Sequence, residues 1–276
     1  MSTFTVMAHR AGPTNTRLGR VLTPAQCVTR LGYGDVVLGR LDVRQSLDGI
    51  EAGLWALDRL AQSGVRVLND PDALATAHDK LATARALLAA GVPHPETIHV
   101  APWLELPQLR TPVVLKPRFG SWGRDVVLCE TAGEVDEALA DFSTRGWFRA
   151  TGAVAQELIP PHGYDIRIVV AGGRVAGAIR RVAAAGEWRT NVVLGGRREP
   201  VWPTSKACAI AVAAAKATGG ALVGVDLLPS GDGGWVVAEV NGAVDFTSAY
   251  SLGRDVFDVV RDALTPAREP VAAAAI

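Results

Sequence analysis

The sequence is poor in cysteine and has no excess of charge of either sign. Its three cysteines, Cys27, Cys129 and Cys208, lie far apart without a CxxC pair, so we expect no structural zinc site. Their sparse, odd number is typical of a reducing cytoplasm. Twenty-eight Lys and Arg residues balance 28 Asp and Glu residues, so the formal net charge is zero. Nucleic-acid-binding proteins usually carry a basic surface, and we therefore expect no nucleic-acid partner.

The sequence also lacks the apolar segments of membrane and secreted proteins. The longest apolar stretch, residues 207–225, is interrupted by Lys216 and two glycines and predicts a buried helix followed by a strand. Residues 1–10 have no basic head followed by an apolar core, so no secretory signal is expected. We therefore expect a cytoplasmic protein without a membrane partner.

Two common nucleotide-binding motifs are missing as well. No GxGxxG turn follows the first predicted strand, and no GxxxxGK[ST] occurs in the chain, which argues against a dinucleotide-binding Rossmann domain and a P-loop NTPase. The chain has 276 residues, 49% of them hydrophobic, and can bury a substantial core in two or three lobes.

The first quarter of the chain alternates apolar strands with a helical pattern. We expect strands at residues 3–8, 36–38 and 65–68 and a helix at 50–61. This order is typical of a small α/β lobe with a mostly parallel sheet. A polar cap and a proline at residues 69–71 predict another helix, which Gly91 and Pro93 end.

Two short strands near the C-terminus, residues 221–228 and 235–241, flank a glycine-rich turn and predict a hairpin. If the turn centres on Asp232 and Gly233, Asp226 lies opposite Glu239, and Glu239 shares a face with Asn241. Opposed carboxylates repel unless a cation lies between them, and Asp, Glu and Asn oxygens suit Mg²⁺ or Mn²⁺. A solvated edge with incidental acids would show alternating polar residues, whereas these acids stand in apolar runs. The hairpin therefore predicts a metal site.

A second candidate site surrounds Lys116, which ends the apolar strand 112–117. The loop that follows, residues 118–124, contains glycine and serine, so its N–H groups could approach phosphate oxygens; an ordinary hairpin with a basic tip is the alternative. Another hairpin turns at Gly172 and Gly173, and a two-residue turn there would place Asp165 opposite Arg180.

The motifs occur in the order typical of the ATP-grasp fold. From Asp35 to about Val260 the chain resembles the carboxylate–amine ligases of the ribosomal-protein S6 glutamate ligase (RimK) and lysine-biosynthesis (LysX) group. The resemblance rests on Asn69-Asp70-Pro71, Asp79-Lys80, Val114-Leu115-Lys116-Pro117, Gly120-Ser121-Trp122-Gly123-Arg124, Gln156-Glu157, Asp165-Ile166-Arg167, Arg189-Thr190-Asn191, Gly224-Val225-Asp226-Leu227 and Glu239-Val240-Asn241. The Ser-Trp-Gly-Arg loop and residues 239–246 look like the LysX branch.

The resemblance implies a role for each of these residues. It implies that Lys80 and Lys116 contact ATP phosphates and that a loop formed by Gly120, Ser121, Trp122 and Gly123 closes over them. The backbone of Glu157 and Leu158 would hold adenine, and Asp165, Arg189, Thr190 and Asn191 would contact ATP. By the same resemblance, Asp226, Glu239 and Asn241 bind Mg²⁺ or Mn²⁺, and Arg167, Arg181 and Lys116 support catalysis.

The expected architecture is an α/β ATP-grasp fold with a short N-terminal lobe. We expect this pre-ATP-grasp lobe at residues 1–75, the ATP-grasp domain at 76–265 and a flexible tail at 266–276. Within the ATP-grasp domain, the small lobe spans about 97–157 and the large lobe about 158–265. The family also implies a homo-oligomer, a dimer or a tetramer.

The implied reaction is ADP-forming amide synthesis through an acyl phosphate, with an amino acid added to the C-terminal Glu of a small acidic carrier protein. The alternatives are a free amino-acid or peptide ligase of a secondary-metabolite pathway and a RimK-type protein glutamate ligase. Two departures from LysX bear on substrate choice: the opening before Asp35 reads differently, and Val192-Val193-Leu194 is apolar where LysX-like chains often have arginine. A regulatory nucleotide-binding protein without turnover would not need the complete set of metal and lysine residues.

Overall fold

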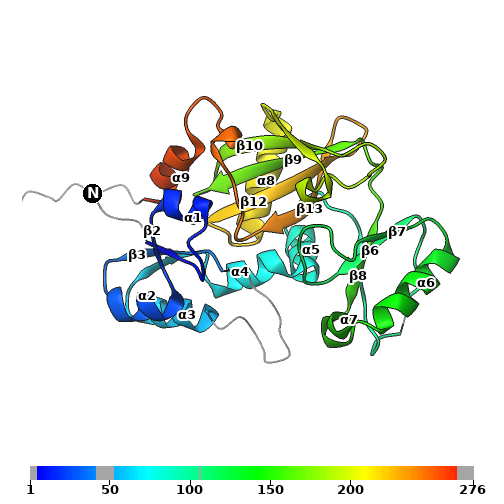
Figure 1. Cartoon of the computed structure of the whole chain (residues 1–276), viewed down its shortest axis with the longest axis horizontal. Coiled ribbons are helices and arrows are strands. Elements are labelled where there is room, and N and C mark those ends of the chain that lie inside the picture. The colour runs from blue at the N-terminus through cyan, green and yellow to red at the C-terminus, as the bar shows by residue number, and fades with distance from the viewer. Residues whose placement is uncertain (1–4, 42–52, 106, 266–276) are drawn as a thin grey trace, which may run out of the picture.

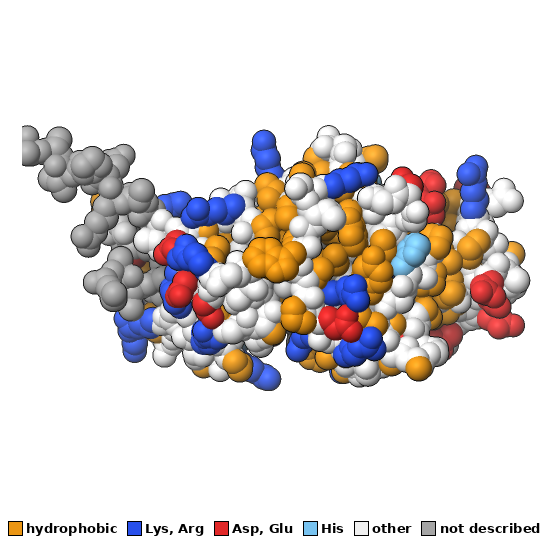
Figure 2. Space-filling model, turned by 90° about the horizontal axis from the view of Figure 1, so that it is seen from above, with side chains coloured by type: hydrophobic (Ala, Val, Ile, Leu, Met, Phe, Trp, Pro, Cys, Tyr) orange, Lys and Arg blue, Asp and Glu red, His pale blue; other side chains and the backbone are white. Residues whose placement is uncertain are grey.

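The computed structural model describes residues 5–41, 53–105 and 107–265. An N-terminal lobe, a small lobe and a large lobe surround a central region (Figure 1). The predicted tail at 266–276 and the first residues of the predicted helix 50–61 lie outside the described residues. Within the described ranges, no helix is both long and apolar enough to cross a membrane. On the face seen in Figure 2, basic and acidic side chains lie among apolar patches, as the balanced composition suggests.

The N-terminal lobe contains a four-stranded parallel sheet in the order β2-β1-β3-β4. Its elements are β1 (Thr5–Met7), α1 (Pro13–Leu18), β2 (Arg20–Leu22), α2 (Pro24–Arg30), β3 (Val36–Gly39), α3 (Leu54–Gln62) and β4 (Arg66–Leu68). The predicted parallel α/β arrangement is present. The sequence interpretation missed β2 and α2, although α2 begins with a capping box between Thr23 and Gln26.

The helix predicted after residue 69 is two helices, α4 (Pro71–His78) and α5 (Lys80–Ala89). The break lies at Asp79, whose backbone is extended and whose carboxylate accepts a hydrogen bond from the Leu81 N–H at 3.0 Å. In α5, Leu81, Ala84 and Leu87 are buried, whereas Leu88 is 71% exposed.

The small lobe contains an antiparallel sheet in the order β5-β8-β6-β7. Its elements are β5 (Thr97–Val100), β6 (Val113–Pro117), β7 (Val127–Cys129), α6 (Ala132–Ser143), α7 (Gly146–Thr151) and β8 (Ala153–Glu157). Alternation along β6 sends Val113 and Leu115 into a core with Phe142 and Phe148. Lys116 therefore lies on the opposite face of the sheet.

The large lobe contains a five-stranded sheet in the order β11-β10-β9-β12-β13. Its elements are β9 (Tyr164–Ala171), β10 (Arg174–Val182), the 3₁₀ turn η1 (Val192–Leu194), β11 (Arg197–Pro200), α8 (Ser205–Ala217), β12 (Leu222–Pro229), β13 (Trp235–Asn241), η2 (Ser248–Tyr250) and α9 (Val256–Leu264). One face of the sheet packs on the alanines of α8. The other face shares a core with α9 and the N-terminal lobe.

The second face of this sheet changes from apolar to charged side chains along its strands. On β9, Val169 and Ala171 belong to the core beneath α9, whereas Asp165 and Arg167 continue the same face toward the small lobe. This end of the face therefore carries charged side chains in place of apolar core residues and can form a site.

The strand pairings of the two predicted hairpins can be compared with the structure. Asp226 lies opposite Glu239 as predicted, although a bulge interrupts the pairing directly after Asp226. The predicted pairing of Asp165 with Arg180 is wrong by one residue: Asp165 lies opposite Arg181, because a bulge between Val175 and Gly177 shifts the register.

Candidate active site

A cleft lies between the small-lobe sheet and the polar half of the large sheet, with about 1100 Å³ of space that is partly open to solvent. It brings together fifteen of the predicted site residues, namely Lys80, Lys116, Gly120, Ser121, Trp122, Gly123, Glu157, Leu158, Asp165, Arg181, Arg189, Thr190, Asn191, Asp226 and Glu239. Arg167 and Asn241 are outside this lining. Residues that are spread along the sequence from Lys80 to Glu239 therefore meet in one site.

The large-lobe wall is a network of interlocked ion pairs. Arg167 Nε and Nη2 donate to the two carboxylate oxygens of Asp226 at 2.6 and 2.7 Å. Arg181 donates to Asp226 at 2.9 Å and also to Asp165, which in turn accepts from the Thr190 hydroxyl at 2.6 Å. Two arginines balance two aspartates, so this buried wall carries no net charge.

The network determines the ionisation of its members. Burial alone would raise the pKa of Asp226, but the charges and hydrogen bonds of Arg167 and Arg181 outweigh it and lower the pKa to about 2. Burial likewise opposes the charge of Arg181, yet the pKa of Arg181 is raised by Asp226 and Asp165. Contrary to the expectation from the sequence, Asp226 does not need a metal as its counter-charge, because Arg167 and Arg181 already supply one.

The opposite wall carries two lysines. Lys80 Nζ donates to the Gly120 carbonyl at 2.7 Å and lies 3.5 Å from Glu239 Oε1. Burial, and then the charge of Lys80, lower the pKa of Lys116 to about 8 against the opposing influence of Glu239 and Asp226. Among the described residues, no hydrogen bond or ion pair of the Lys116 ammonium is found. Lys80 is paired with Glu239, whereas the neighbouring Lys116 ammonium has no such partner among the described residues. An unpaired lysine beside a second positive charge favours a bound anion such as a phosphate.

The predicted phosphate loop forms the rim of this wall. Its backbone enters the left-handed region at Trp122 (φ 66°) and Gly123 (φ 71°), and the exposed Trp122 ring lies 5.3 Å from the Arg124 guanidinium carbon. Arg189 donates to the Gly123 carbonyl at 3.1 Å, and a Cβ at Gly123 would lie 2.9 Å from Asn191 Oδ1. The loop therefore rests on the segment 189–191 across the cleft, and a side chain at Gly123 would displace the Asn191 amide and strain the left-handed backbone.

The strand end predicted to hold adenine also lines the cleft. The Glu157 N–H already donates to the Glu96 carbonyl at 3.0 Å. A base could therefore use the remaining backbone groups of Glu157 and Leu158, while their adenine contact stays a prediction.

Three oxygen-bearing residues remain as cation ligands. Asp226 and Glu239 face each other, and Asn241 lies two residues farther along the same face. The Asn241 Nδ2 atom is buried and has no hydrogen-bond partner among the described residues. No group of three or more His, Cys, Asp and Glu residues suited to a metal occurs in the described ranges, so a cation here would need Asn241 and ligand oxygens as well. The donor chemistry, oxygen only, fits Mg²⁺.

Two contacts of the site had no signal in the sequence. Arg118 donates to both Asp79 oxygens, at 2.8 and 2.5 Å, and so ties the base of the glycine loop to the start of α5. Glu187 binds Arg189 through two side-chain hydrogen bonds, at 3.0 and 2.8 Å, which lower the pKa of Glu187 to about 2. The first pair joins residues 39 positions apart, a distance that no local pattern reveals.

The arrangement of lobes and cleft agrees with known proteins. A family model for the RimK-like ATP-grasp domain matches residues 77–259. Over 214 residues, 76% of each chain, the protein is 30% identical to glutamate–LysW ligase ArgX of Sulfurisphaera tokodaii. It is 31% identical over 229 residues, 79% of this chain and 74% of the relative, to a protein of Chromohalobacter salexigens named as a probable alpha-L-glutamate ligase.

A solved structure is similar over nearly the whole chain. ATP-grasp ligase PsnB, in complex with a precursor variant, Mg and ADP, has a TM-score of 0.61 at 18% identity and covers 95% of this chain and 97% of its own. The predicted ATP-grasp fold and the resemblance to the RimK group are therefore confirmed. The chain belongs to the RimK-like ATP-grasp family, whose named relatives are ligases.

Proposed function

We propose that the protein is an ADP-forming carboxylate–amine ligase that adds an amino acid to the C-terminal Glu of a small acidic carrier protein. One observation carries the proposal: Lys80, Lys116, Asp226 and Glu239 line a single cleft, in which Lys80 Nζ lies 3.5 Å from Glu239 Oε1. This arrangement suits a polyphosphate together with a divalent cation. The relative named glutamate–LysW ligase supports a carrier as the acceptor.

The proposed reaction has two steps. The acceptor carboxylate attacks the γ-phosphate of ATP and gives an acyl phosphate and ADP; the amine then attacks the acyl carbon, and phosphate leaves. Phosphoryl transfer depends on positioning and on neutralisation of charge rather than on a protein nucleophile. The cleft matches this need, because Lys80, Lys116, Arg181 and Arg189 are among the groups that line it.

The residues of the two walls would act differently. Lys80 and Lys116 bind the phosphates, and the loop of Gly120, Ser121, Trp122 and Gly123 covers them and excludes water from the acyl phosphate. Asp165, Arg189, Thr190 and Asn191 contact the nucleotide, and the backbone of Glu157 and Leu158 orients its base. Arg181, on the cleft wall, and Arg167, behind Asp226, hold the acids in place and stabilise the transferred charge.

Asp226, Glu239 and Asn241 would hold Mg²⁺ or Mn²⁺, which supplies a positive charge next to the phosphates. A cation there would have to share Asp226 with its two arginines. The protein would act in the cytoplasm, and we propose a homo-oligomer.

The deciding experiment measures ADP release with Mg·ATP, screened over amino acids alone, with an acidic peptide ending in Glu, and with a ribosomal-protein tail. Release that needs both substrates supports the carrier ligase and identifies the amino acid. Release with free amino acids alone would instead indicate a peptide ligase. Release that needs a ribosomal-protein tail and glutamate would indicate a RimK-type enzyme, and tight ATP binding without release would indicate a regulatory protein.

A further inference from the structure

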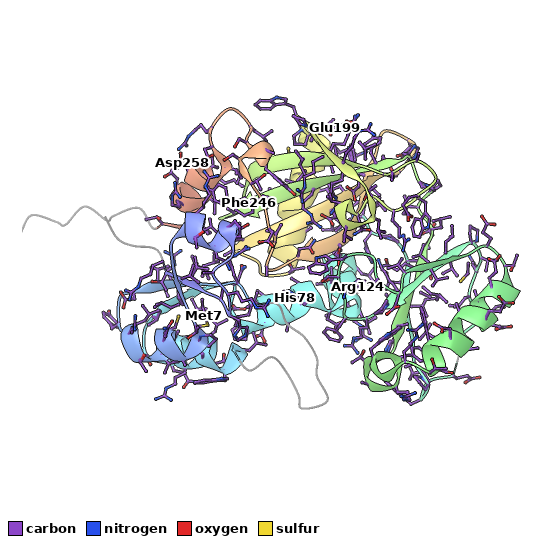
Figure 3. All side chains as sticks on the ribbon, viewed as in Figure 1. Met7, His78, Arg124, Glu199, Phe246 and Asp258 are labelled. Atoms are coloured by element: carbon purple, nitrogen blue, oxygen red, sulfur yellow. The ribbon has the colours of Figure 1, made fainter. Side chains whose placement is uncertain are left out.

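The segment that follows Asn241 is held by side chains from the N-terminal lobe. Asn69 Nδ2 donates to the Gly242 carbonyl at 3.1 Å, and Arg40 Nη2 donates to the Val244 carbonyl at 2.7 Å. Thr14 Oγ1 lies 3.2 Å from the Phe246 carbonyl and 3.3 Å from the Phe246 N–H, which donates to it. Gly242, Val244 and Phe246 are therefore each bonded to a different residue of the N-terminal lobe, and Figure 3 shows Phe246 where α1 meets the large lobe.

Asn69 makes the most extensive of these contacts. Besides Gly242, its amide donates to the Leu222 carbonyl at 2.7 Å and accepts from the N–H groups of Ala221 and Leu222 at 2.7 and 2.9 Å. The residue is 2% exposed and has a left-handed backbone (φ 51°), which asparagine tolerates better than most residues. One side chain thus joins the start of β12 to the end of β13, the strands that carry Asp226 and Asn241.

Arg40 is almost completely buried and anchored on both sides. Its Nε donates to Asn15 Oδ1 at 2.5 Å, and its Nη2 lies 3.3 Å from Asp245 Oδ1. Burial lowers the pKa of Arg40 to about 10, against the opposing charge of Asp245, so the guanidinium remains charged at neutral pH. A charged group held in this way fixes the carbonyl of Val244 firmly.

Close packing gives the held segment little freedom. A Cβ on Gly242 would lie 3.2 Å from Leu74 Cδ2 in α4, and a Cβ on Gly224 would lie 2.5 Å from Val244 Cγ2. Asn241, by contrast, has a buried Nδ2 without a partner among the described residues. The position of its amide therefore depends on the backbone to which it is attached, and that backbone is fixed one residue later.

We propose that Thr14, Arg40 and Asn69 are positioning residues for the cation site. By fixing residues 242–246 they hold Asn241, and through β13 also Glu239, in the geometry that a divalent cation requires. The N-terminal lobe then has a role in catalysis that does not depend on any contact of its own with a substrate. The inference rests on the proposed function, because it concerns the same ligand set.

Thr14→Val provides the sharpest test, because it keeps the shape of the side chain and removes both contacts with Phe246. Thr16→Val is the matched control: it lies in the same helix, and within the described part of the chain its hydroxyl bonds only to the carbonyls of Gly12 and Pro13. Asn69→Asp is a second variant, which retains the acceptor oxygen and removes the donors to Leu222 and Gly242. Mn²⁺ binding to the full chain is measured by electron paramagnetic resonance with a non-hydrolysable ATP analogue present.

We expect Thr14→Val and Asn69→Asp to weaken Mn²⁺ binding at least fivefold, while metal-free affinity for the analogue stays within twofold. Hydrogen exchange at residues 242–246 should become faster in both variants and remain unchanged in Thr16→Val. Faster exchange with unchanged Mn²⁺ affinity overturns the proposal, and so does an equal loss in Thr16→Val. A wild-type protein that binds no Mn²⁺ would overturn the metal assignment itself, which distinguishes that failure from a failure of positioning alone.

Discussion

The two walls of the cleft differ in how their charged side chains are neutralised. On the large-lobe wall, Arg167 and Arg181 are bonded to Asp226 and Asp165, so the charges satisfy one another within the protein. On the facing wall, Lys116 lacks such a partner among the described residues, and its pKa is lowered to about 8. The first wall is complete before any ligand arrives, whereas the second is completed by the ligand. Stability and ligand binding should therefore respond differently to changes on each wall.

The largest expected effect comes from Asp226→Asn, which leaves two buried arginines with one aspartate fewer. Breaking a buried ion pair from one side costs about 3–5 kcal/mol of unfolding free energy, because the remaining charge is uncompensated. ADP release should also fall on the order of 10²–10³-fold. Thermal unfolding and an ADP assay measure the two effects. Asp262→Asn removes an exposed partner of Arg254 and serves as control. A variant as stable and active as wild type would contradict the role given to Asp226.

Lys116→Met should separate function from stability. Methionine keeps most of the side-chain volume and removes a buried ammonium, so the protein should unfold at the same temperature as wild type or slightly higher. ADP release should still fall on the order of 10²–10³-fold, because a charge next to the phosphates is lost. If unfolding temperature and activity fell together, the contrast between the walls would not hold.

The same lysine predicts a pH dependence of known sign. Its pKa is about 8 in the folded protein and 10.5 for an ordinary lysine in the unfolded chain, so the folded state binds fewer protons between these values. The contribution of this group to the unfolding free energy should therefore increase as pH rises from about 8 to about 10.5.

The same group should also make nucleotide binding depend on pH. Phosphates favour the charged lysine, so nucleotide binding near pH 8 should take up protons and weaken at higher pH. Calorimetry in buffers of different ionisation enthalpy measures the uptake, which Lys116→Met should abolish; uptake that persists would assign it to another group.

Asp226 should make the unfolding free energy depend on pH in the acid range. Its pKa is lowered from 3.8 to about 2, so its contribution to stability is complete above about pH 4 and is lost as pH falls through 2. Acid unfolding of wild type and Asp226→Asn should therefore converge below this range. Parallel curves down to pH 2 would show that Asp226 does not carry this linkage.

The smallest effect is expected in the glycine loop. Gly123→Ala places a Cβ against Asn191 Oδ1 at a left-handed backbone position, so the loop should shift and the KM for ATP should rise severalfold with little change in unfolding temperature. Gly133→Ala is the control, because the nearest atom to its Cβ would be 4.0 Å away. An unchanged KM in Gly123→Ala would mean that loop position does not control nucleotide binding.

Local patterns predicted much of this fold. Apolar runs on either side of glycine-containing turns identified the strands of both hairpins, and the turn after Pro229 placed Asp226 opposite Glu239. The ordered motifs, rather than any single spacing, identified the family and with it the cleft. Lys80 is an example. Its local sequence is typical of a surface lysine, and only its place in the order of motifs predicts that it lies in the site.

The errors come from features that local patterns do not encode. The bulge between Val175 and Gly177 moved Arg181 into the position predicted for Arg180. The sequence predicted one helix after residue 69, but two helices form. The carboxylate of Asp79 caps the second helix, α5, and also binds Arg118. Asn69 and Arg40 joined the lobes across more than 150 positions, a contact that depends on the completed fold.

The change from charged to apolar residues along β9 also bears on how the chain reaches its native pairing. A slip of one residue would exchange the faces, placing Asp165 and Arg167 against the alanines of α8 and Ile166 and Ile168 in the cleft. An arginine buried against alanine has neither space nor a counter-charge there, so the slipped strand would be strongly disfavoured. The charges that serve the reaction therefore also serve folding, because they leave the sheet only one acceptable alignment.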